Sequence, residues 1–186
     1  MTFIVFSGLP GTGKSTVARQ LAPRLGLPLL DKDDFLDTLF AERGVGDAEW
    51  RTSLSREADE RFATAAKQLG QACFVSWWRH RDSSTQSGTP TEWLSTLPAP
   101  IVEVHCRCGV PTAVERFLTR QRHPGHLDSS RTRSSLLTEF TALHDRPLGI
   151  GPVIDLETET EVDSDSLLHS IRAAVASATV HIVADA

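Results

Sequence analysis

The sequence has no hydrophobic run long enough to cross a membrane, few cysteines and no excess of positive charge. No stretch approaches the roughly 18 apolar residues that a membrane-spanning helix needs. Three cysteines do not supply a disulfide framework, and such usage is typical of the reducing cytoplasm. A net charge of -5 disfavours a dedicated nucleic-acid-binding protein, which normally carries a basic excess. We therefore expect a cytoplasmic protein that binds neither a membrane nor nucleic acid.

A leader segment and internal repeats are also missing from the pattern of the sequence. No basic region precedes the first apolar stretch, so we expect no signal peptide. No unit of roughly 20–50 residues recurs along the chain. The 186 residues are 40% hydrophobic and 23% charged, which is the composition of a globular protein. This length predicts one domain over residues 1–186.

Apolar stretches of strand length alternate with amphipathic stretches of helix length along the chain. The predicted strands are 2–7, 28–31, 73–77, 101–106 and 152–156. The predicted helices are 15–25, 33–42, 47–69, 110–122, 134–144 and 163–178, and residues 179–186 form a short strand or a frayed tail. This alternation predicts an α/β fold, a three-layer α/β/α sandwich around a mostly parallel five-stranded sheet. Ligands of such sheets bind beyond the carboxyl ends of the strands.

The segment from Gly8 to Ser15 matches the phosphate-binding motif G-x-x-x-x-G-K-[ST] in full. It follows a predicted strand and opens a predicted helix, so backbone N–H groups and the helix dipole can surround a phosphate. Lys14 would reach the β- and γ-phosphates, and the Ser15 hydroxyl would bind Mg²⁺. The expected nucleotide contacts are Gly8, Gly11, Thr12, Gly13, Lys14, Ser15 and Thr16. The alternative is a glycine turn with an incidental lysine.

An acidic cluster, Asp31-Lys32-Asp33-Asp34, follows the second predicted strand. Asp31 and Asp33 can face the same side because side chains of a strand alternate between its two faces. One carboxylate could hold a metal ion or its water shell, and the other could accept a proton from an attacking hydroxyl. The alternative for Asp33 and Asp34 is that they only cap the following helix.

Lys14-Ser15 together with Asp31-x-Asp33 resembles the P-loop small-molecule kinases of the gluconate kinase and shikimate kinase type, within the nucleoside-monophosphate-kinase-like group. The resemblance implies a P-loop kinase fold and transfer of the γ-phosphate of ATP to a hydroxyl of a small molecule. It also implies that Asp33 contacts the substrate hydroxyl as the candidate base, and that Asp31 lies with Ser15 at Mg²⁺. It leaves the acceptor open among a sugar acid, a nucleoside, an antibiotic or a similar metabolite.

A basic segment follows the fourth predicted strand. Arg116 and Arg120 are four residues apart and therefore share one helix face. The residues 116–126 resemble the lid of these kinases, in which arginines close over the phosphates, and we expect a short lid at about 119–131. The resemblance implies that Arg116 and Arg120 bind the nucleotide and that Arg120 is catalytic, with Arg122 a further candidate. A solvated basic face is the alternative.

The acceptor pocket of the resembled kinases lies at the end of the third strand. There, Trp77 and Arg79 could grip an anionic substrate, and Arg51, Arg56 or Arg61 could contact it from the covering helix, with Arg56 our chosen candidate. The alternatives are that one tryptophan belongs to the core and that the arginines are solvated. The sequence departs from the family here, because residues 73–78 lack a strand ending in Asp and a glycine-rich turn.

Two other functions remain open at this stage. A polynucleotide 5′-kinase uses similar parts, although the acidic balance argues against it. A nucleotide-operated switch or ATPase module would hydrolyse slowly without an acceptor, whereas a kinase should release ADP in response to one. No guanine-selecting N-K-x-D follows a strand. Oligomeric state is open as well.

Overall fold

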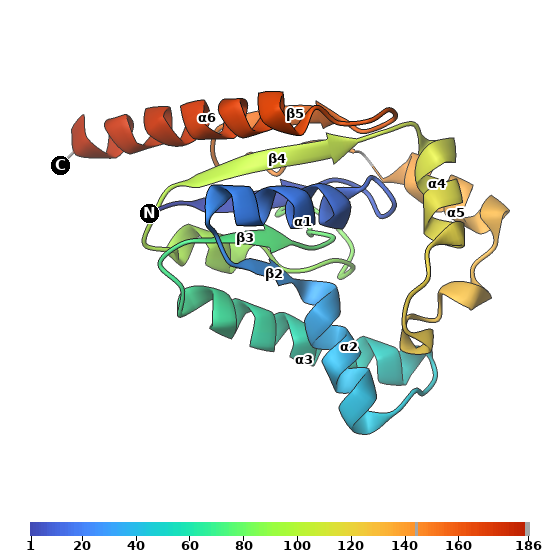
Figure 1. Ribbon diagram of the computed structural model, residues 1–186. Coiled ribbons are helices and arrows are strands. Elements are labelled where there is room, and N and C mark those ends of the chain that lie inside the picture. The colour runs from blue at the N-terminus through green and yellow to red at the C-terminus, as the bar shows by residue number, and fades with distance from the viewer. Residues whose placement is uncertain (144, 185–186) are drawn as a thin grey trace.

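Five parallel strands form one sheet at the centre of the molecule (Figure 1). The computed structural model describes residues 1–143 and 145–184. The strand order is β2-β3-β1-β4-β5. The strands are β1 (Phe3–Ser7), β2 (Leu29–Asp31), β3 (Ala72–Val75), β4 (Ile101–Arg107) and β5 (Val153–Glu157). All pairs are parallel, which confirms the predicted α/β class and the five-stranded sheet.

Helices cover both faces of this sheet and its carboxyl edge. On one face lie α1 (Lys14–Leu25) and α6 (Ser164–Ala184), and on the other lies α3 (Ala48–Lys67). At the carboxyl edge lie α2 (Lys32–Arg43), α4 (Val110–Thr119) and α5 (Arg133–Ala142), to which the strand arrows point in Figure 1. Short 3₁₀ turns are η1 (Glu92–Thr96), η2 (Pro124–His126) and η3 (Asp128–Ser130). The predicted three layers are therefore present.

The central strand β1 shows why the sequence builds two hydrophobic layers. All five of its residues are buried, as expected for a strand covered on both faces. Ile4 and Phe6 pack with α1 and α6, whereas Phe3 and Val5 pack with α3. This split follows from the alternation of side chains along a strand. The last residue of β1 is Ser7, and the glycine-rich segment begins directly after it.

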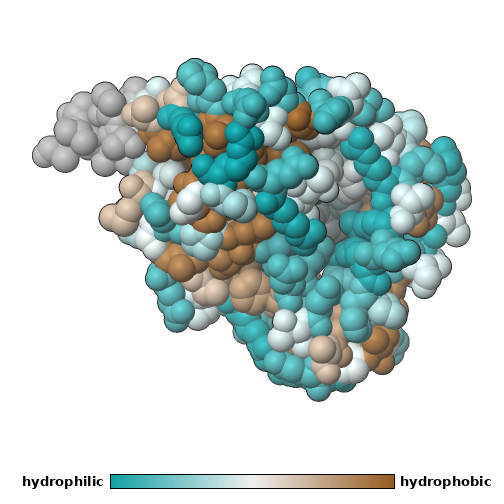
Figure 2. Space-filling view, viewed as in Figure 1, coloured by the Kyte–Doolittle hydropathy of each residue, from teal (hydrophilic) through white to brown (hydrophobic). Residues whose placement is uncertain are grey.

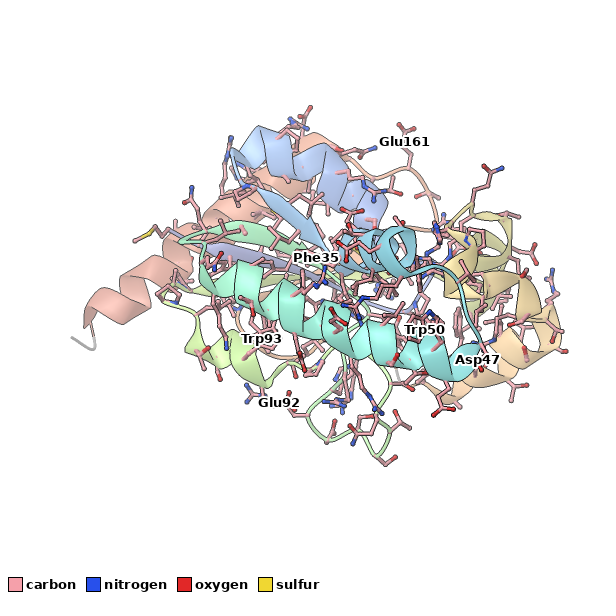
Figure 3. The ribbon with its side chains drawn as sticks, turned by 90° about the horizontal axis from the view of Figure 1, so that it is seen from below. Phe35, Asp47, Trp50, Glu92, Trp93 and Glu161 are labelled. Carbon is pink, nitrogen blue, oxygen red and sulfur yellow. The ribbon has the colours of Figure 1, made fainter. Side chains whose placement is uncertain are left out.

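Aromatic rings fill the layer between the sheet and α3. Phe62 of α3 is fully buried and has four aromatic neighbours at ring-centroid distances of 5.6 to 5.8 Å. These neighbours are Phe35, Phe74, Trp78 and Trp93. In Figure 3, Phe35 and Trp93 lie on opposite sides of α3. The cluster fixes α3 against the sheet and so fixes the side chains that α3 presents at the carboxyl edge.

Two predicted helix ends are wrong. The helix predicted over 110–122 ends at Thr119, because the backbone of Arg120 turns to an extended conformation with ψ 144°. The last helix continues to Ala184, so no short strand follows it within the described residues. Residue 144, predicted as the end of a helix, and residues 185–186 lie outside the described part. None of the described helices combines the length and apolarity needed to cross a membrane.

Replacing Phe62 with Ala should lower the free energy of unfolding by about 3–5 kcal/mol, since it removes a fully buried ring and leaves a cavity. Urea unfolding followed by circular dichroism measures this change. Leu118→Ala is the matched control, because 38% of Leu118 is already exposed, and it should cost less than about 1 kcal/mol. Equal losses in the two variants would contradict the assignment of Phe62 to the centre of the core.

Candidate active site

The loop between β1 and α1 has a backbone that only glycine permits at three positions. Gly8, Gly11 and Gly13 have φ values of 122°, 86° and 83°. A Cβ atom on Gly8 would lie 2.0 Å from the carbonyl oxygen of Cys106, and one on Gly11 would lie 2.1 Å from that of Ala113. The glycines therefore allow the loop to press against β4 and α4. This is the strand–loop–helix setting that the motif requires.

Hydroxyl groups fasten this loop to the connection after β5. Thr12 is fully buried, and its hydroxyl donates to the carbonyl of Leu9 at 2.8 Å. The hydroxyl of Thr158 donates to the carbonyl of Thr12 at 2.9 Å. The guanidinium of Arg116 donates to the carbonyl of Thr158 at 2.8 Å. Arg116 therefore lies beside the loop but is linked to it through Thr158, while Thr16 is exposed on the first turn of α1.

Lys14 is folded back onto its own loop. Only 7% of its surface is exposed, and its Nζ donates to the carbonyls of Gly8 at 2.9 Å and Leu9 at 2.7 Å. Burial lowers the pKa of Lys14 to about 8, because removal from water disfavours the ammonium form, although nearby acidic groups oppose this. A buried ammonium that has only neutral carbonyl partners is well prepared to receive an anion.

Asp31 connects the loop to α2. Its Oδ2 accepts a hydrogen bond from the Ser15 hydroxyl at 2.7 Å, and its Oδ1 accepts one from the backbone N–H of Asp33 at 3.1 Å. The cap of α2 is therefore Asp31, so Asp33 and Asp34 stand in the first turn. Burial and the charge of Asp33 raise the pKa of Asp31, while its hydrogen bonds lower it.

The Ser15 hydroxyl and the Asp31 carboxylate are hard oxygen ligands of the kind that Mg²⁺ prefers, and they stand in contact beside the loop. In the described part of the chain, no group of three His, Cys, Asp or Glu side chains converges on one point. An ion that keeps several waters and takes one carboxylate fits this sparse protein ligand set better than one that needs a closed cage.

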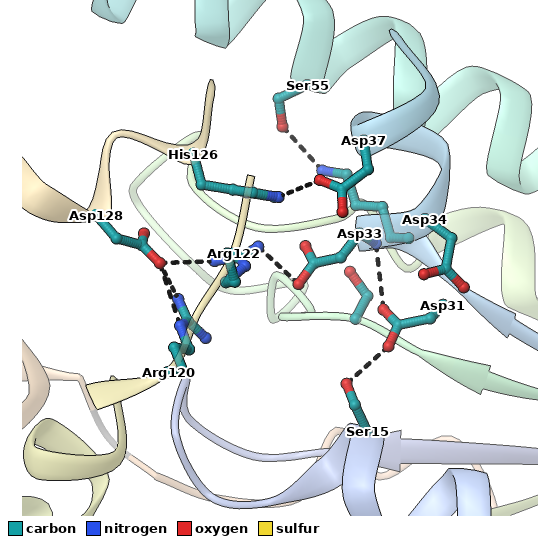
Figure 4. A network of polar contacts seen from close by, with 12 residues as sticks. Ser15, Asp31, Asp33, Asp34, Asp37, Ser55, Arg120, Arg122, His126 and Asp128 are labelled. Carbon is teal, nitrogen blue, oxygen red and sulfur yellow. Dashed lines mark hydrogen bonds and ion pairs between the residues drawn. The ribbon is translucent and has the colours of Figure 1, made fainter. Parts of the chain in front are cut away.

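Asp33 faces the segment between α4 and α5, which was predicted as the lid (119–131). Arg122 Nη2 lies 2.6 Å from Asp33 Oδ2, and its Nη1 lies 3.3 Å from Asp128 Oδ2 (Figure 4). Burial alone would raise the pKa of Asp33, but the positive charges of Arg122, His126 and Arg120 outweigh it and hold that pKa below its usual value. Asp33 is therefore an ionised carboxylate at neutral pH.

Arg120 also pairs within the lid segment. Its Nη2 lies 3.1 Å from Asp128 Oδ2, and its guanidinium stacks over the Phe117 ring at 4.0 Å from the centroid. The structure brings these residues to the same edge of the sheet, because Lys14 and Asp33 follow the ends of β1 and β2, Arg122 contacts Asp33, and Arg120 and Arg122 share Asp128. Mostly hydrophilic residues border the hollow between the sheet and the lid segment (Figure 2).

The lid segment is docked on α2 and α3 by specific contacts. His126 is 4% exposed, and its Nε2 lies 2.7 Å from Asp37 Oδ1. The rings of His123 and Phe40 stack at 5.2 Å, and a Cβ atom on Gly125 would lie 2.5 Å from the Phe40 ring. From α3, Arg51 donates to the carbonyl of His126 at 3.1 Å. The close approach requires glycine at position 125.

A buried lysine lies between α2 and α3. Lys32 is 8% exposed, and its Nζ lies 2.8 Å from Asp59 Oδ1 and 2.9 Å from the Ser55 hydroxyl. Asp59 in turn accepts from the Thr89 hydroxyl at 2.7 Å, which contacts the Ser76 hydroxyl at 2.6 Å. This chain of polar groups connects α2, α3 and the end of β3 beneath Asp33.

The two tryptophans after β3 have different places. Trp78 is 4% exposed and donates from its indole to the carbonyl of Phe6 at 2.9 Å, so it belongs to the core. Trp77 and Arg79 line a small crevice whose wall also includes Trp78 and, from the loop, Gly8 and Leu9. The crevice therefore adjoins the predicted phosphate site from the β3 side.

One predicted substrate contact does not join this group, and two residues that do were not selected from the sequence. Arg56 is exposed in an outward groove of α3 with Ser53 and Glu60, away from the face that carries Ser55 and Asp59. Asp37 and Asp128 are the residues missed, and no local pattern in the sequence marked them. Arg51 was expected as a possible contact alongside Arg56 and Arg61, and its helical spacing of four from Ser55 and eight from Asp59 distinguishes it from them.

Replacing Lys14 with Met should make the nucleotide-free protein more stable at pH 7, by up to roughly 2–3 kcal/mol, because a buried charge is removed. The unfolded chain binds more protons at this position than the folded chain between pH 8 and 10.5, so the wild type should regain the difference as pH rises through that range. Urea unfolding at pH 7 and 9.5 measures this. Lys67→Met, an exposed lysine, is the control. A less stable Lys14→Met variant at pH 7 would contradict the burial penalty.

The known proteins and solved structures to which this chain is similar include kinases. The chain is 63% identical over 30 residues to a shikimate kinase from Paracidovorax citrulli, a match that covers 16% of each protein. Among solved structures, it is similar to a candidate kinase from Chloroflexus aurantiacus, with a TM-score of 0.80 and 26% identity over 93% of this chain and 97% of the other. It also shares the fold of a gluconokinase from Sinorhizobium meliloti, with a TM-score of 0.51 and 16% identity over 100% of this chain and 97% of the other.

A family model gives the broadest match in sequence. Residues 4–136, which include the loop, the acidic cluster and the whole lid segment, match the model described as an AAA domain (AAA_18). The shared fold with shikimate and gluconate kinases confirms the resemblance that the motifs indicated. The chain therefore belongs to this AAA-domain family of P-loop proteins, and its fold is that of the P-loop kinases.

Proposed function

We propose that the protein is a kinase that transfers the γ-phosphoryl group of ATP to a hydroxyl of a small molecule. The observation that carries the proposal is the placement of Asp33. Its ionised carboxylate stands two residues from Asp31, which contacts the P-loop through Ser15, and it faces arginines of the lid segment. A nucleotide switch that only hydrolyses ATP has no need of such a second carboxylate.

The P-loop would hold the nucleotide phosphates. Its positive-φ glycines and the start of α1 supply backbone N–H groups, and Lys14 would exchange the carbonyls of Gly8 and Leu9 for phosphate oxygens. Because carbonyls are weaker partners for an ammonium than phosphates are, this exchange favours nucleotide binding. Ser15 and Asp31 would hold Mg²⁺, which when bound neutralises charge on the phosphates.

Asp33 would serve the acceptor. A hydroxyl oxygen of the acceptor attacks the γ-phosphorus, the bond to the bridging oxygen of ADP breaks, and the hydroxyl proton passes to the Asp33 carboxylate. The lowered pKa keeps Asp33 in the ionised form that can accept a hydrogen bond from this hydroxyl. Lid arginines, with Arg120 foremost, would spread the charge of the transferring group, while Arg116 would border the nucleotide.

The crevice lined by Trp77 and Arg79 is our candidate for the part of the acceptor site that extends beyond Asp33, since Asp33 is not among the described residues that line it. Arg79 donates to Gln86 at 2.6 Å, and in the described part of the chain no carboxylate lies within ion-pair distance of it. A planar ring in Trp77 and an uncommitted guanidinium favour an acceptor that carries a negative group. We infer that Arg51, rather than Arg56, contacts the acceptor or the lid from α3, since only Arg51 lies at the lid.

A panel of hydroxyl-bearing metabolites tests the proposal directly. Wild-type protein with Mg·ATP should release ADP in response to some members of the panel, and mass spectrometry should show one added phosphate on the acceptor. The panel should include sugar acids, nucleosides, antibiotics and a 5′-hydroxyl oligonucleotide. ATP hydrolysis that no acceptor stimulates, with unmodified compounds throughout, would contradict a kinase and favour an ATPase module.

With an acceptor in hand, Asp33→Asn should lower the turnover number by about 100-fold or more, because the amide cannot take up the proton. Its dissociation constant for ATP should stay within a few-fold of the wild-type value, as calorimetric titration can measure. Asp34→Asn is the matched control, since 67% of the Asp34 side chain is exposed, and it should retain turnover. Near-normal turnover in Asp33→Asn would remove Asp33 from the role of base.

A further inference from the structure

Two arginines of the lid segment pair with a carboxylate of the same segment. Asp128 Oδ2 lies 3.1 Å from Arg120 Nη2 and 3.3 Å from Arg122 Nη1. A single oxygen atom therefore receives both guanidinium groups (Figure 4). All three side chains are largely enclosed, with exposed fractions of 26%, 17% and 22% for Arg120, Arg122 and Asp128. Ion pairs that are partly removed from water are stronger than those at the open surface.

The backbone before Asp128 is strained. Leu127 is the one described residue other than glycine with a positive φ, at 58°. A left-handed conformation is unfavourable in a side-chain-bearing residue and persists only where surrounding contacts hold it. Here it turns the chain between η2 and η3, and Asp128 is the first residue after the turn. The strained turn therefore places the Asp128 carboxylate beside Arg120 and Arg122.

Arg122 is divided between two carboxylates. Its Nη2 contacts Asp33 at 2.6 Å while its Nη1 contacts Asp128, so it covers the candidate base and is held there by the lid. A phosphoryl group carries more negative charge than a carboxylate and offers the same paired oxygens to a guanidinium. A γ-phosphate near the P-loop would therefore compete with Asp128 for both arginines.

We propose that Asp128 is a positioning residue, which holds Arg120 and Arg122 in the nucleotide-free enzyme and yields them to the γ-phosphate of bound ATP. The inference rests on the proposed kinase function. On this proposal, Asp128 has two effects. It competes for the arginines and so lowers the affinity for nucleotides that carry a γ-phosphate. It also keeps the arginines from stabilising attack by water on the γ-phosphate before an acceptor is present.

Calorimetric titration with Mg²⁺ and a non-hydrolysable ATP analogue, and separately with ADP, tests the proposal in the full chain. Asp128→Asn keeps the side-chain shape and removes the charge, so it should bind the ATP analogue about tenfold more tightly. Its affinity for ADP, which lacks the γ-phosphate, should stay within about twofold. Hydrolysis of ATP without acceptor should rise about tenfold, since the released arginines reach the phosphate.

Two further variants separate charge from structure. Asp128→Glu retains the carboxylate and should restore affinity for the analogue toward the wild-type value. Glu115→Gln removes a half-exposed carboxylate that pairs with Arg133, and it controls for the change in net charge. Hydrogen exchange of the lid amides reports whether the segment 119–131 keeps its fold in each variant.

The outcomes are decisive in both directions. Tighter binding of the analogue alone, reversed by Asp128→Glu, supports the proposal. Unchanged or weaker binding overturns it, and weaker binding with lost protection of the lid amides makes Asp128 a purely structural residue. Equal tightening of ADP, or the same change in Glu115→Gln, also overturns it, because the effect is then general charge. Failure of the wild type to bind either nucleotide would instead contradict the proposed function itself.

Discussion

The rest of the site depends on the two hydrogen bonds that the Asp31 carboxylate accepts. One of its oxygens accepts from Ser15 at the end of the P-loop, and the other accepts from the backbone of Asp33 at the start of α2. Because α2 begins at this cap, the direction of its first turn is set relative to the P-loop. Asp33 therefore faces the lid segment. Loss of the cap would leave the P-loop intact and move the candidate base.

The electrostatics of the site follow from this placement. Arg122, His126 and Arg120 lie around Asp33, and their positive charges keep its carboxylate ionised although the side chain is partly buried. Among the described residues, Lys14 has no carboxylate contact, and its hydrogen bonds go to the carbonyls of its own loop, so its charge is available to a ligand. The anionic groups of the nucleotide would thus enter a site whose cations are already present, and these cations would exchange their present partners for phosphate oxygens.

The fold and the phosphate loop could be predicted because both depend on local patterns. Alternating apolar segments predicted the five strands, and eight residues after β1 predicted the P-loop with its glycines. The helix that carries Arg51 and Arg56 was also expected, but the sequence does not show which of its faces meets the lid. Amphipathic spacing fixes a helix phase only approximately, and one residue turns a side chain by about 100°.

The path of the lid segment could not be predicted for a different reason. After Arg120 the chain leaves the helical conformation, and two short turns with a left-handed Leu127 between them bring Asp128 back to the arginines. His126 and Asp37 are 89 residues apart and meet only because the lid packs on Phe40. Contacts that depend on such packing have no local signature in the sequence.

A crystal structure of the protein with Mg²⁺ and a non-hydrolysable ATP analogue tests the central claim most directly. We expect the triphosphate in the loop from Gly8 to Ser15, with Lys14 Nζ on phosphate oxygens in place of the carbonyls of Gly8 and Leu9. We also expect the Asp33 carboxylate to face an open cavity next to the γ-phosphate. A nucleotide bound elsewhere, or an Asp33 that points away from the γ-phosphate, would contradict the claim that this edge of the sheet transfers a phosphoryl group.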